Sequence, residues 1–210
     1  DGTVSCWGDD FFGQSSSPAL SFVDVAAGSI HTCGIDTLEQ AHCWGDNQYG
    51  QSTPPNDLFT EISSGRHHSC AMDTSGELHC WGDNQYGQST PPVGVFTHLS
   101  SGDTHNCALD AFGAPTCWGF NGYGQTSPPN GSFVQLQSGN NYSCAQTVSG
   151  ALECWGDDQL NQCSPPAETY FQISAGTNHA CGILTDGSIE CWGENLHGET
   201  APEPTLNVLH

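Results

Sequence analysis

Twelve cysteines are the residues of this sequence with the clearest capacity for chemistry. Ten of them form pairs whose members lie ten residues apart, with a short turn sequence midway between them. Such a turn places the two cysteines opposite each other on a β-hairpin, close enough for a disulfide. The expected pairs are Cys33/Cys43, Cys70/Cys80, Cys107/Cys117, Cys144/Cys154 and Cys181/Cys191.

A thiolate metal site is the alternative use of these cysteines, because a histidine stands two residues before the first cysteine of most pairs. Zinc sites prefer cysteines separated by only two to four residues, and this sequence has no such spacing. Disulfides are therefore favoured, and they indicate an oxidising compartment. Cys6 and Cys163 are left over, and each is a candidate for an intermolecular bridge or for a tolerated free thiol.

A column of histidines accompanies the cysteines. It consists of His31, His68, His105 and His179, with Tyr142 in the remaining place. A ring of metal ligands is one interpretation, but a tyrosine would interrupt it. The structural interpretation, in which each side chain bonds backbone carbonyls and fixes its own segment, is favoured.

All these residues follow a repeat of 37 residues. The triplet Cys-Trp-Gly recurs at this interval and contains all six tryptophans. We therefore expect a single repeat domain, residues 1–210. Its full units are 22–58, 59–95, 96–132, 133–169 and 170–206, with partial units at 1–21 and 207–210.

Each unit contains three short segments rich in β-forming residues, followed by a loop that ends in Pro-Pro or a related sequence. The second and third segments are joined by a tight turn in which glycine supplies a positive φ. Glu39 replaces that glycine in one unit, so a different turn type is expected there. Asn161 replaces a loop glycine, and asparagine is the residue that best tolerates the left-handed region. The sequence predicts an all-β fold with no helix.

Charge excludes several classes of function. The chain has 23 acidic residues and one basic residue, Arg66, which gives a formal net charge of −22. Nucleic-acid binding requires many lysines and arginines, and a polybasic membrane anchor requires them too. No apolar run is long enough to span a bilayer.

The repeated patterns resemble the regulator of chromosome condensation repeat. They read [AS]-[AS]-G-x-x-H-[TS]-C-[GA]-[IM]-D and G-x-[LV]-x-C-W-G-[DE]-N-x-[YH]-G-[QE], and the resemblance extends from Asp1 to about Pro204. It implies a β-propeller, commonly of seven blades with four antiparallel strands each. The cysteine-containing variant of this family is extracellular. Nucleotide exchange and chromatin contact, the activities of the founding intracellular member, are not carried over, because the cysteines and the charge oppose them.

The length of the chain is not a whole number of 37-residue units. Six complete units of 37 residues would occupy 222 residues, 12 more than the 210 present. About six blades are thus visible in the sequence. We expect a segment of a seven-bladed ring or of a longer array, with a six-bladed ring closed at an incomplete seam as the alternative.

The loops of a propeller of this kind should place two sets of residues on one rim. The first set is acidic and consists of Asp9, Asp46, Asp83, Asp157 and Glu194, interrupted by Phe120. It is either a weak Ca²⁺ site or, as we favour, a solvated acidic face that needs no cofactor. The second set is aromatic, with side chains suited to a protein interface, and consists of Phe11, Phe12, Tyr49, Tyr86, Phe120 and Tyr123. Asn130 and Asn141 lie in glycosylation sequons.

No catalytic motif occurs, so an enzyme is not expected. The favoured function is a non-catalytic, secreted or cell-surface scaffold, adhesion or filament-forming module that contacts a protein partner or assembles with itself. The alternative is a secreted enzyme inhibitor, since the family also resembles a propeller-type β-lactamase inhibitory protein. The loop sequence D-N-Q-Y-G-Q-S-T-P-P occurs twice, from Asp46 and from Asp83, and such uniform loops favour the scaffold over the inhibitor.

Overall fold

The computed structural model describes residues 2–201, and these residues form five antiparallel sheets of three strands each. The sheets are β1(Phe22–Ala27), β2(His31–Asp36) and β3(Ala41–Gly45); β4(Phe59–Ser64), β5(His68–Asp73) and β6(Leu78–Gly82); β7(Phe96–Ser101), β8(His105–Asp110) and β9(Pro115–Gly119); β10(Phe133–Ser138), β11(Tyr142–Thr147) and β12(Leu152–Gly156); and β13(Tyr170–Ala175), β14(His179–Leu184) and β15(Ile189–Gly193). The described part of the chain contains no helix, and the predicted all-β class is confirmed.

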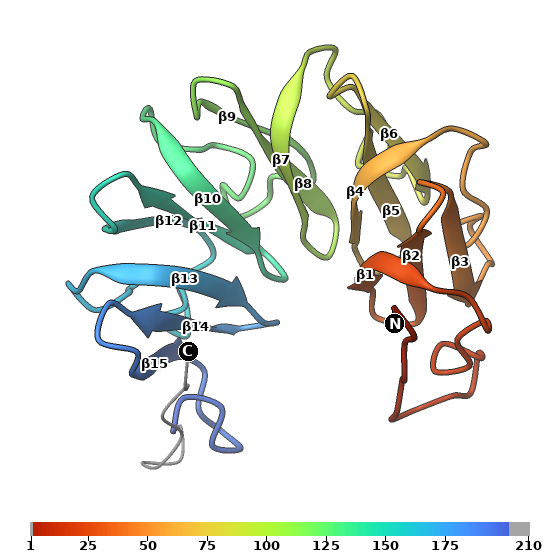
Figure 1. Cartoon of the computed structure of the whole chain (residues 1–210). Helices are drawn as coiled ribbons and strands as arrows, with labels where there is room; N and C mark the ends of the chain where they lie inside the picture. Colours follow the sequence, from red (N-terminus) through yellow and green to blue (C-terminus); the bar gives the residue numbers. More distant parts are fainter. Residues whose placement is uncertain (1, 202–210) are drawn as a thin grey trace.

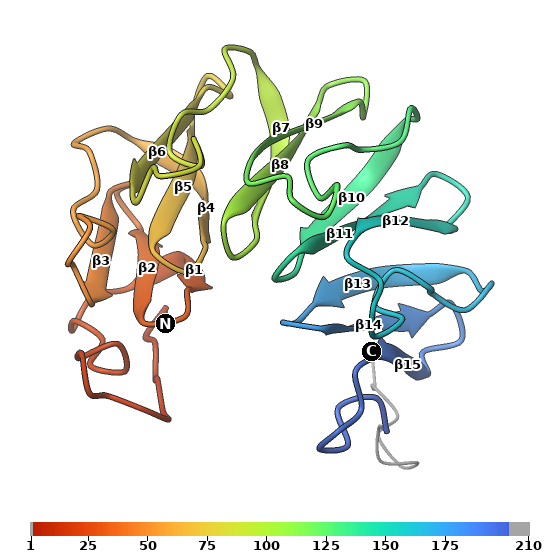
Figure 2. The same ribbon diagram turned by 180° about the vertical axis from the view of Figure 1, so that it is seen from behind.

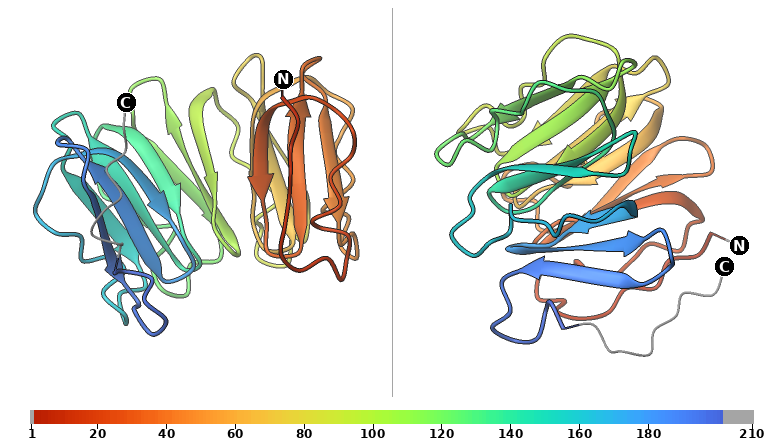
Figure 3. Two further views of the ribbon diagram at one scale, coloured as in Figure 1. Left: turned by 60° about the horizontal axis from the view of Figure 1, so that its bottom comes forward. Right: turned by 90° about the vertical axis from the view of Figure 1, so that its left-hand side faces the viewer.

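Each sheet is one blade, and the blades follow one another in chain order along an open arc (Figures 1 and 2). Neighbouring sheets stand face to face (Figure 3). The N-terminal segment and the loop after β15 lie on the two sides of the opening (Figure 1). The segment before β1 forms an isolated bridge, Thr3 to Ser21, instead of a sheet. The expected partial unit 207–210 and the end of the unit 170–206 lie outside the described residues.

The three β-rich segments of each unit are its three strands, as expected from the sequence, whereas the family resemblance implied four strands in each blade. The fourth segment of each unit is a loop that contains hydrogen-bonded turns. In most units a Pro-Pro sequence ends this loop before the next blade begins. The predicted change of turn type at Glu39 is wrong. Glu39 adopts φ 64° and repeats the turn that Gly76 forms with φ 85°. Asp36 stabilises this turn, because its carboxylate accepts hydrogen bonds from the backbone N–H groups of Leu38 and Gln40.

Every blade has a β-bulge in its first strand, and in the first, second and fourth blades a side chain at this bulge bonds the next blade. In the first blade the bulge lies between Phe22 and Asp24. The Asp24 carboxylate accepts the Ile62 backbone N–H at 3.1 Å, and the Glu61 carboxylate accepts the Leu99 N–H at the same distance. The Gln135 side-chain oxygen does the same for Ile173 in the fourth blade. The bulge therefore supplies a side-chain acceptor for the first strand of the following blade.

The hydrophobic core lies between blades rather than within them. Each cluster joins the second strand of one blade to the strands of the next, as where Cys33 and Ile35 pack against Phe59, Ile62 and Trp81. Four of the five disulfides, all except Cys181–Cys191, have their cysteines in these clusters. In all five the bridged cysteines lie directly opposite each other in the strand register. The five bonds are Cys33–Cys43, Cys70–Cys80, Cys107–Cys117, Cys144–Cys154 and Cys181–Cys191. The bonds thus supplement a lean core at the blade interfaces.

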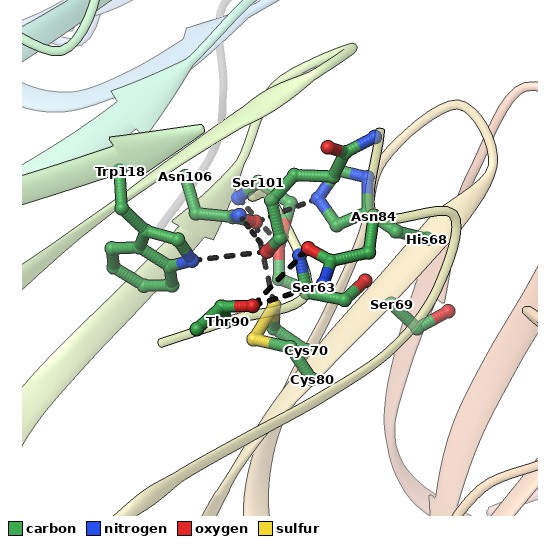
Figure 4. The surroundings of a disulfide bond; sticks show 12 residues. Ser63, His68, Ser69, Cys70, Cys80, Asn84, Thr90, Ser101, Asn106 and Trp118 are labelled. Carbon is green, nitrogen blue, oxygen red and sulfur yellow. Dashed lines mark hydrogen bonds between the residues drawn. A yellow bond between two sulfur atoms is a disulfide. The ribbon is translucent and has the colours of Figure 1, made fainter. Parts of the chain in front are cut away.

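The histidine column fixes neighbouring blades to each other. His68 Nε2 lies 2.8 Å from Asn106 Oδ1 in the next blade (Figure 4), and His31 and His105 make the equivalent contacts with the hydroxyls of Ser69 and Ser143. Within residues 2–201, the expected bonds to backbone carbonyls are made only by Tyr142, whose hydroxyl donates toward Gly176 O and His179 O. Burial lowers the pKa of His31 and His68 to about 4, so these rings are neutral at physiological pH.

The bulge acceptors give a prediction about pH. Burial, with a smaller contribution from the nearby Asp24 charge, raises the pKa of Glu61 from 4.5 to about 7. The unfolded chain loses this proton at lower pH than the folded chain, so the stability contributed by Glu61 is complete below pH 4.5 and is lost as the pH rises to about 7. Glu61→Gln keeps the acceptor and cannot ionise. Its free energy of unfolding should match the parent at pH 4 and exceed it by about 2 to 3 kcal/mol at pH 8, as measured by urea denaturation.

The matched control is Gln135→Glu, which places a carboxyl group in the same position of the fourth blade. It should introduce the pH dependence that Glu61→Gln removes, and so destabilise the chain at pH 8. A Glu61→Gln effect that is the same at both pH values would contradict the account of this bond.

Candidate interaction face

In the loop between each pair of blades, one backbone carbonyl accepts hydrogen bonds from side chains of the next blade. The carbonyl of Gln51 accepts the Trp81 indole N–H at 2.8 Å and the Ser69 hydroxyl at 3.2 Å, both from the next blade. The side chain of Gln51 is buried and braces its own loop, accepting the Tyr49 backbone N–H and donating to Asp46. Indole bonds of this kind are made to the carbonyls of Gln14, Gln51, Gln88, Gln125 and Gln162.

The other end of each loop is attached to the turn between the first two strands of the same blade. The backbone N–H of Asp46 donates to Ile30 O at 2.9 Å, and Phe120 N–H donates to Thr104 O at the same distance. Every blade repeats this bond, so the loops and the turns lie at one end of the molecule. We call the two residues between the glycine and the histidine or tyrosine of each turn the turn ring. It consists of Ser29/Ile30, Arg66/His67, Asp103/Thr104, Asn140/Asn141 and Thr177/Asn178.

The turn ring differs from blade to blade, although the residues on either side of it hardly change. Its five turns line one open cavity of about 670 Å³. Adjacent turns are joined by backbone bonds, since Arg66 N–H donates to Asp103 O and Asp103 N–H donates to Asn140 O. The flanking glycines permit this close approach, because a Cβ at Gly65 would lie 2.5 Å from Gly102 O. Five different side-chain pairs are thus presented on one rigid frame.

The turn ring carries one positively charged and one negatively charged side chain, Arg66 and Asp103. Arg66, the single basic residue of the sequence, lies on the cavity and pairs with Asp103 at 3.7 Å. Burial raises the pKa of Asp103, and the Arg66 guanidinium opposes that shift. His67 packs against the Tyr49 ring with 5.1 Å between centroids, and its buried Nδ1 has no hydrogen-bond partner among residues 2–201. The cavity wall therefore combines one cation with hydrogen-bonding groups.

The expected acidic rim is used mainly inside the loops. Asp46 and Asp83 each accept a hydrogen bond from the glutamine side chain of their own loop, at 2.6 and 2.8 Å. Asp9 accepts from Gln14, Asp157 accepts a backbone N–H, and Glu194 accepts from Asn178. Within residues 2–201, no group of three or more His, Cys, Asp or Glu side chains is placed to hold a metal ion.

The predicted aromatic residues are found on these loops. Tyr49, Tyr86 and Tyr123 are each about half exposed, and Phe11 and Phe12 form an edge-to-face pair in the N-terminal segment. Tyr86 and Phe120 come from successive loops, and their ring centroids are 4.9 Å apart. Phe120 also lies 6.3 Å from Tyr123. The structure thus brings together Tyr86, Phe120 and Tyr123, which we call the aromatic cluster, and leaves Phe11 and Phe12 apart from it.

The remaining predicted residues have separate places. Cys6 and Cys163 form no disulfide within the described chain. The thiol of Cys163 donates to Asp157 O, and burial raises its pKa to about 12. Of the two sequon residues, Asn130 is exposed, whereas Asn141 lies in the turn ring and accepts a hydrogen bond from Gln125.

The turn ring was not among the site residues predicted from the sequence. The available signal was the variable pair in G-x-x-H between two nearly invariant residues. The prediction from sequence considered only cysteines, histidines, acidic residues, aromatic residues and the two sequon asparagines. The variable pairs form a candidate site only because the fold places five turns around one cavity.

Comparison with known proteins agrees with this architecture. Residues 22–51, 59–88 and 172–199 match the regulator of chromosome condensation repeat. The entire ectodomain of the Physcomitrella patens receptor kinase CR4 is 29% identical with a TM-score of 0.72, over 81% of this chain and 52% of that one. The ectodomain of the Arabidopsis thaliana receptor kinase ACR4 is 27% identical with a TM-score of 0.73, over 85% of this chain and 71% of that one. This chain therefore spans about half the length of the moss ectodomain.

A more distant similarity concerns the fold alone. Saccharomyces cerevisiae Prp20p, studied for its binding to Gsp1p and histones, is 19% identical with a TM-score of 0.72, over 82% of this chain and 57% of Prp20p. No curated protein sequence matches the chain significantly. Among residues 2–201 there is no helix with the length and apolar character needed to cross a membrane.

The buried loop glutamines give a prediction about the frame. Gln88 is 1% exposed and bonds both Tyr86 N–H and Asp83, so Gln88→Ala should lower the free energy of unfolding by about 2 to 3 kcal/mol. It should also speed amide hydrogen exchange at Tyr86. The exposed Gln85, three residues earlier in the same loop, is the control, and Gln85→Ala should leave both quantities almost unchanged. Equal effects of the two substitutions would show that the loop is not braced in this way.

Proposed function

Because this chain is built from regulator of chromosome condensation repeats, we propose that it is a non-catalytic extracellular module that binds a protein partner through the loop-and-turn end. This end comprises the turn ring, the cavity that the turns line, and the tyrosines of the surrounding loops. The partner is a macromolecule rather than a small substrate, because the exposed tyrosines extend the surface well beyond the cavity.

The disulfides support an extracellular location. Five bonds in a chain of 210 residues are typical of proteins from oxidising compartments. The similarity to two plant receptor kinase ectodomains points the same way. Adhesion and assembly into filaments are the forms of partner binding that we favour for such a module.

One observation carries the proposal: residue variation is concentrated where it can serve recognition. The loop glutamines, tryptophans and turn glycines repeat because each has a partner in its own blade or the next one. The turn ring has five different residue pairs, and at least the first residue of each pair lines one cavity. A repeated frame with variable residues clustered around one cavity is suited to protein recognition.

The arrangement of titratable groups supports the proposal of a non-catalytic role. The buried histidines are engaged with the next blade, and the loop acids brace their own loops. On the cavity, Arg66 and Asp103 lie 3.7 Å apart and pair with each other. These groups serve the scaffold rather than general acid–base chemistry.

A secreted enzyme inhibitor is the second candidate, and a specific observation favours it. From the sequence alone, the uniform loops favour a scaffold over an inhibitor. The hydrogen bonds within and between blades account for that uniformity without a scaffold function. The variable turn ring, in contrast, suits a single asymmetric partner such as an enzyme. An inhibitor would use the same end of the molecule. The two candidates differ in the partner, which is a fixed surface for the module and a soluble enzyme for the inhibitor.

The test is a triple substitution of Tyr49, Tyr86 and Tyr123 to serine. The labelled variant should attach to the surface of the producing cells, or self-associate in light scattering, at least about tenfold more weakly than the parent, because aromatic side chains dominate interface energies. Its secretion should hardly change, since all three rings are about half exposed.

The matched control removes three exposed apolar side chains from the opposite end, where the second and third strands are joined. Leu38, Leu58 and Phe112 are 70%, 50% and 84% exposed. Their substitution by serine should leave attachment and self-association unchanged. Unchanged binding by the tyrosine variant would refute the proposal, as would a loss confined to the control.

A further inference from the structure

The third blade is the place where the loop repeat changes its chemistry. Phe120 stands where the other loops have an aspartate or glutamate, and Gly122 stands where the two identical loops have Gln48 and Gln85. Both changes occur in one loop. Gln125, which has no aspartate to bond in this loop, donates instead to Asn141 Oδ1 at 3.3 Å.

The two changes depend on each other in space. A Cβ placed on Gly122 would lie 2.3 Å from the Phe120 ring, so the ring takes the space that a side chain at residue 122 would need. In this position Phe120 lies 4.9 Å from Tyr86 and 6.3 Å from Tyr123, measured between ring centroids. The pair Phe120 and Gly122 therefore creates the aromatic cluster.

The fold does not require this cluster. The sequence Asp-Asn-Gln-Tyr-Gly-Gln forms the same loop after the first and second blades, with the same turn bonds. Tyr86 and Tyr123 remain 46% and 48% exposed, so the cluster is open to a partner. Exposed aromatic groups that folding does not need are typical of interaction sites.

The surrounding charge defines what such a cluster would attract. Asp83 lies in the same loop as Tyr86, and Asp103 adjoins Thr104, whose carbonyl accepts the Phe120 N–H. Asp157 occupies in the next loop the position that Phe120 has in this one. The nearby cation, Arg66, is paired with Asp103. The whole chain carries a net charge of −22. Aromatic faces in a negative field attract arginine and lysine side chains.

We propose that the aromatic cluster of Tyr86, Phe120 and Tyr123 receives an arginine or lysine side chain from a basic segment of the partner protein. The inference rests on the proposed function and specifies the chemistry of its partner. A second copy of this sequence cannot supply such a segment, because Arg66 is its only basic residue. The guanidinium or ammonium group would lie against the ring faces, and Asp83 and Asp157 would supply long-range attraction.

The test separates recognition by the rings from attraction by net charge. The double variant Phe120→Asp with Gly122→Gln rebuilds the loop sequence found after the first two blades, so it should fold. It also adds one negative charge. Binding of a labelled octa-arginine peptide is measured by fluorescence anisotropy at physiological salt. Recognition by the cluster predicts about three- to tenfold weaker binding by the double variant.

The matched control is Phe112→Asp, which makes the same substitution on an 84% exposed phenylalanine at the opposite end. It should leave octa-arginine binding unchanged or slightly tighter. Equal or tighter binding by the double variant would overturn the inference, because net charge alone would then explain the attraction. Absence of binding by the parent would overturn it too. Neither result bears on the proposed function, which the surface-attachment measurement tests separately.

Discussion

The hydrogen bond from the tryptophan indole of each blade to the loop carbonyl of the preceding unit is the contact on which the rest of the structure depends. It connects the end of one blade to the third strand of the next, and all five blades have it, with N···O distances of 2.8 to 3.1 Å. The same carbonyls of Gln51 and Gln88 also accept a side chain from the second strand, Ser69 or Asn106. A buried carbonyl without such a donor would lower the free energy of unfolding. The loop therefore needs both the indole and the second strand of the next blade to satisfy its carbonyl.

This constraint explains where the chain is uniform and where it varies. Loop residues such as Gln88 and Asp83 repeat because they position the shared carbonyl, not because a partner reads them. The histidine column and the bulge acceptors repeat for similar reasons, since their partners lie in the adjacent blade. Variation is tolerated in the turn ring, where at least one residue of each pair lines the cavity. The frame is thus the reason that a binding surface can differ from blade to blade without loss of the fold.

Sequence reasoning reached the repeat, the three strands and the disulfides because all of these depend on spacing along the chain. It failed at Glu39, since a positive φ in a residue other than glycine depends on the bonds that Asp36 makes around the turn. It also missed the turn ring and the pairing of Phe120 with Gly122. Both are contacts between residues whose proximity follows from the arrangement of blades, and no local pattern marks them.

The most direct test of the frame is hydrogen exchange of the tryptophan indole N–H groups, observed by NMR. Strong protection is expected for Trp44, Trp81, Trp118, Trp155 and Trp192, which all donate to a loop carbonyl. Trp7, which is 88% exposed, should exchange rapidly. Exchange at one common rate for all six indoles would contradict the claim that these bonds fix the blades and their loops.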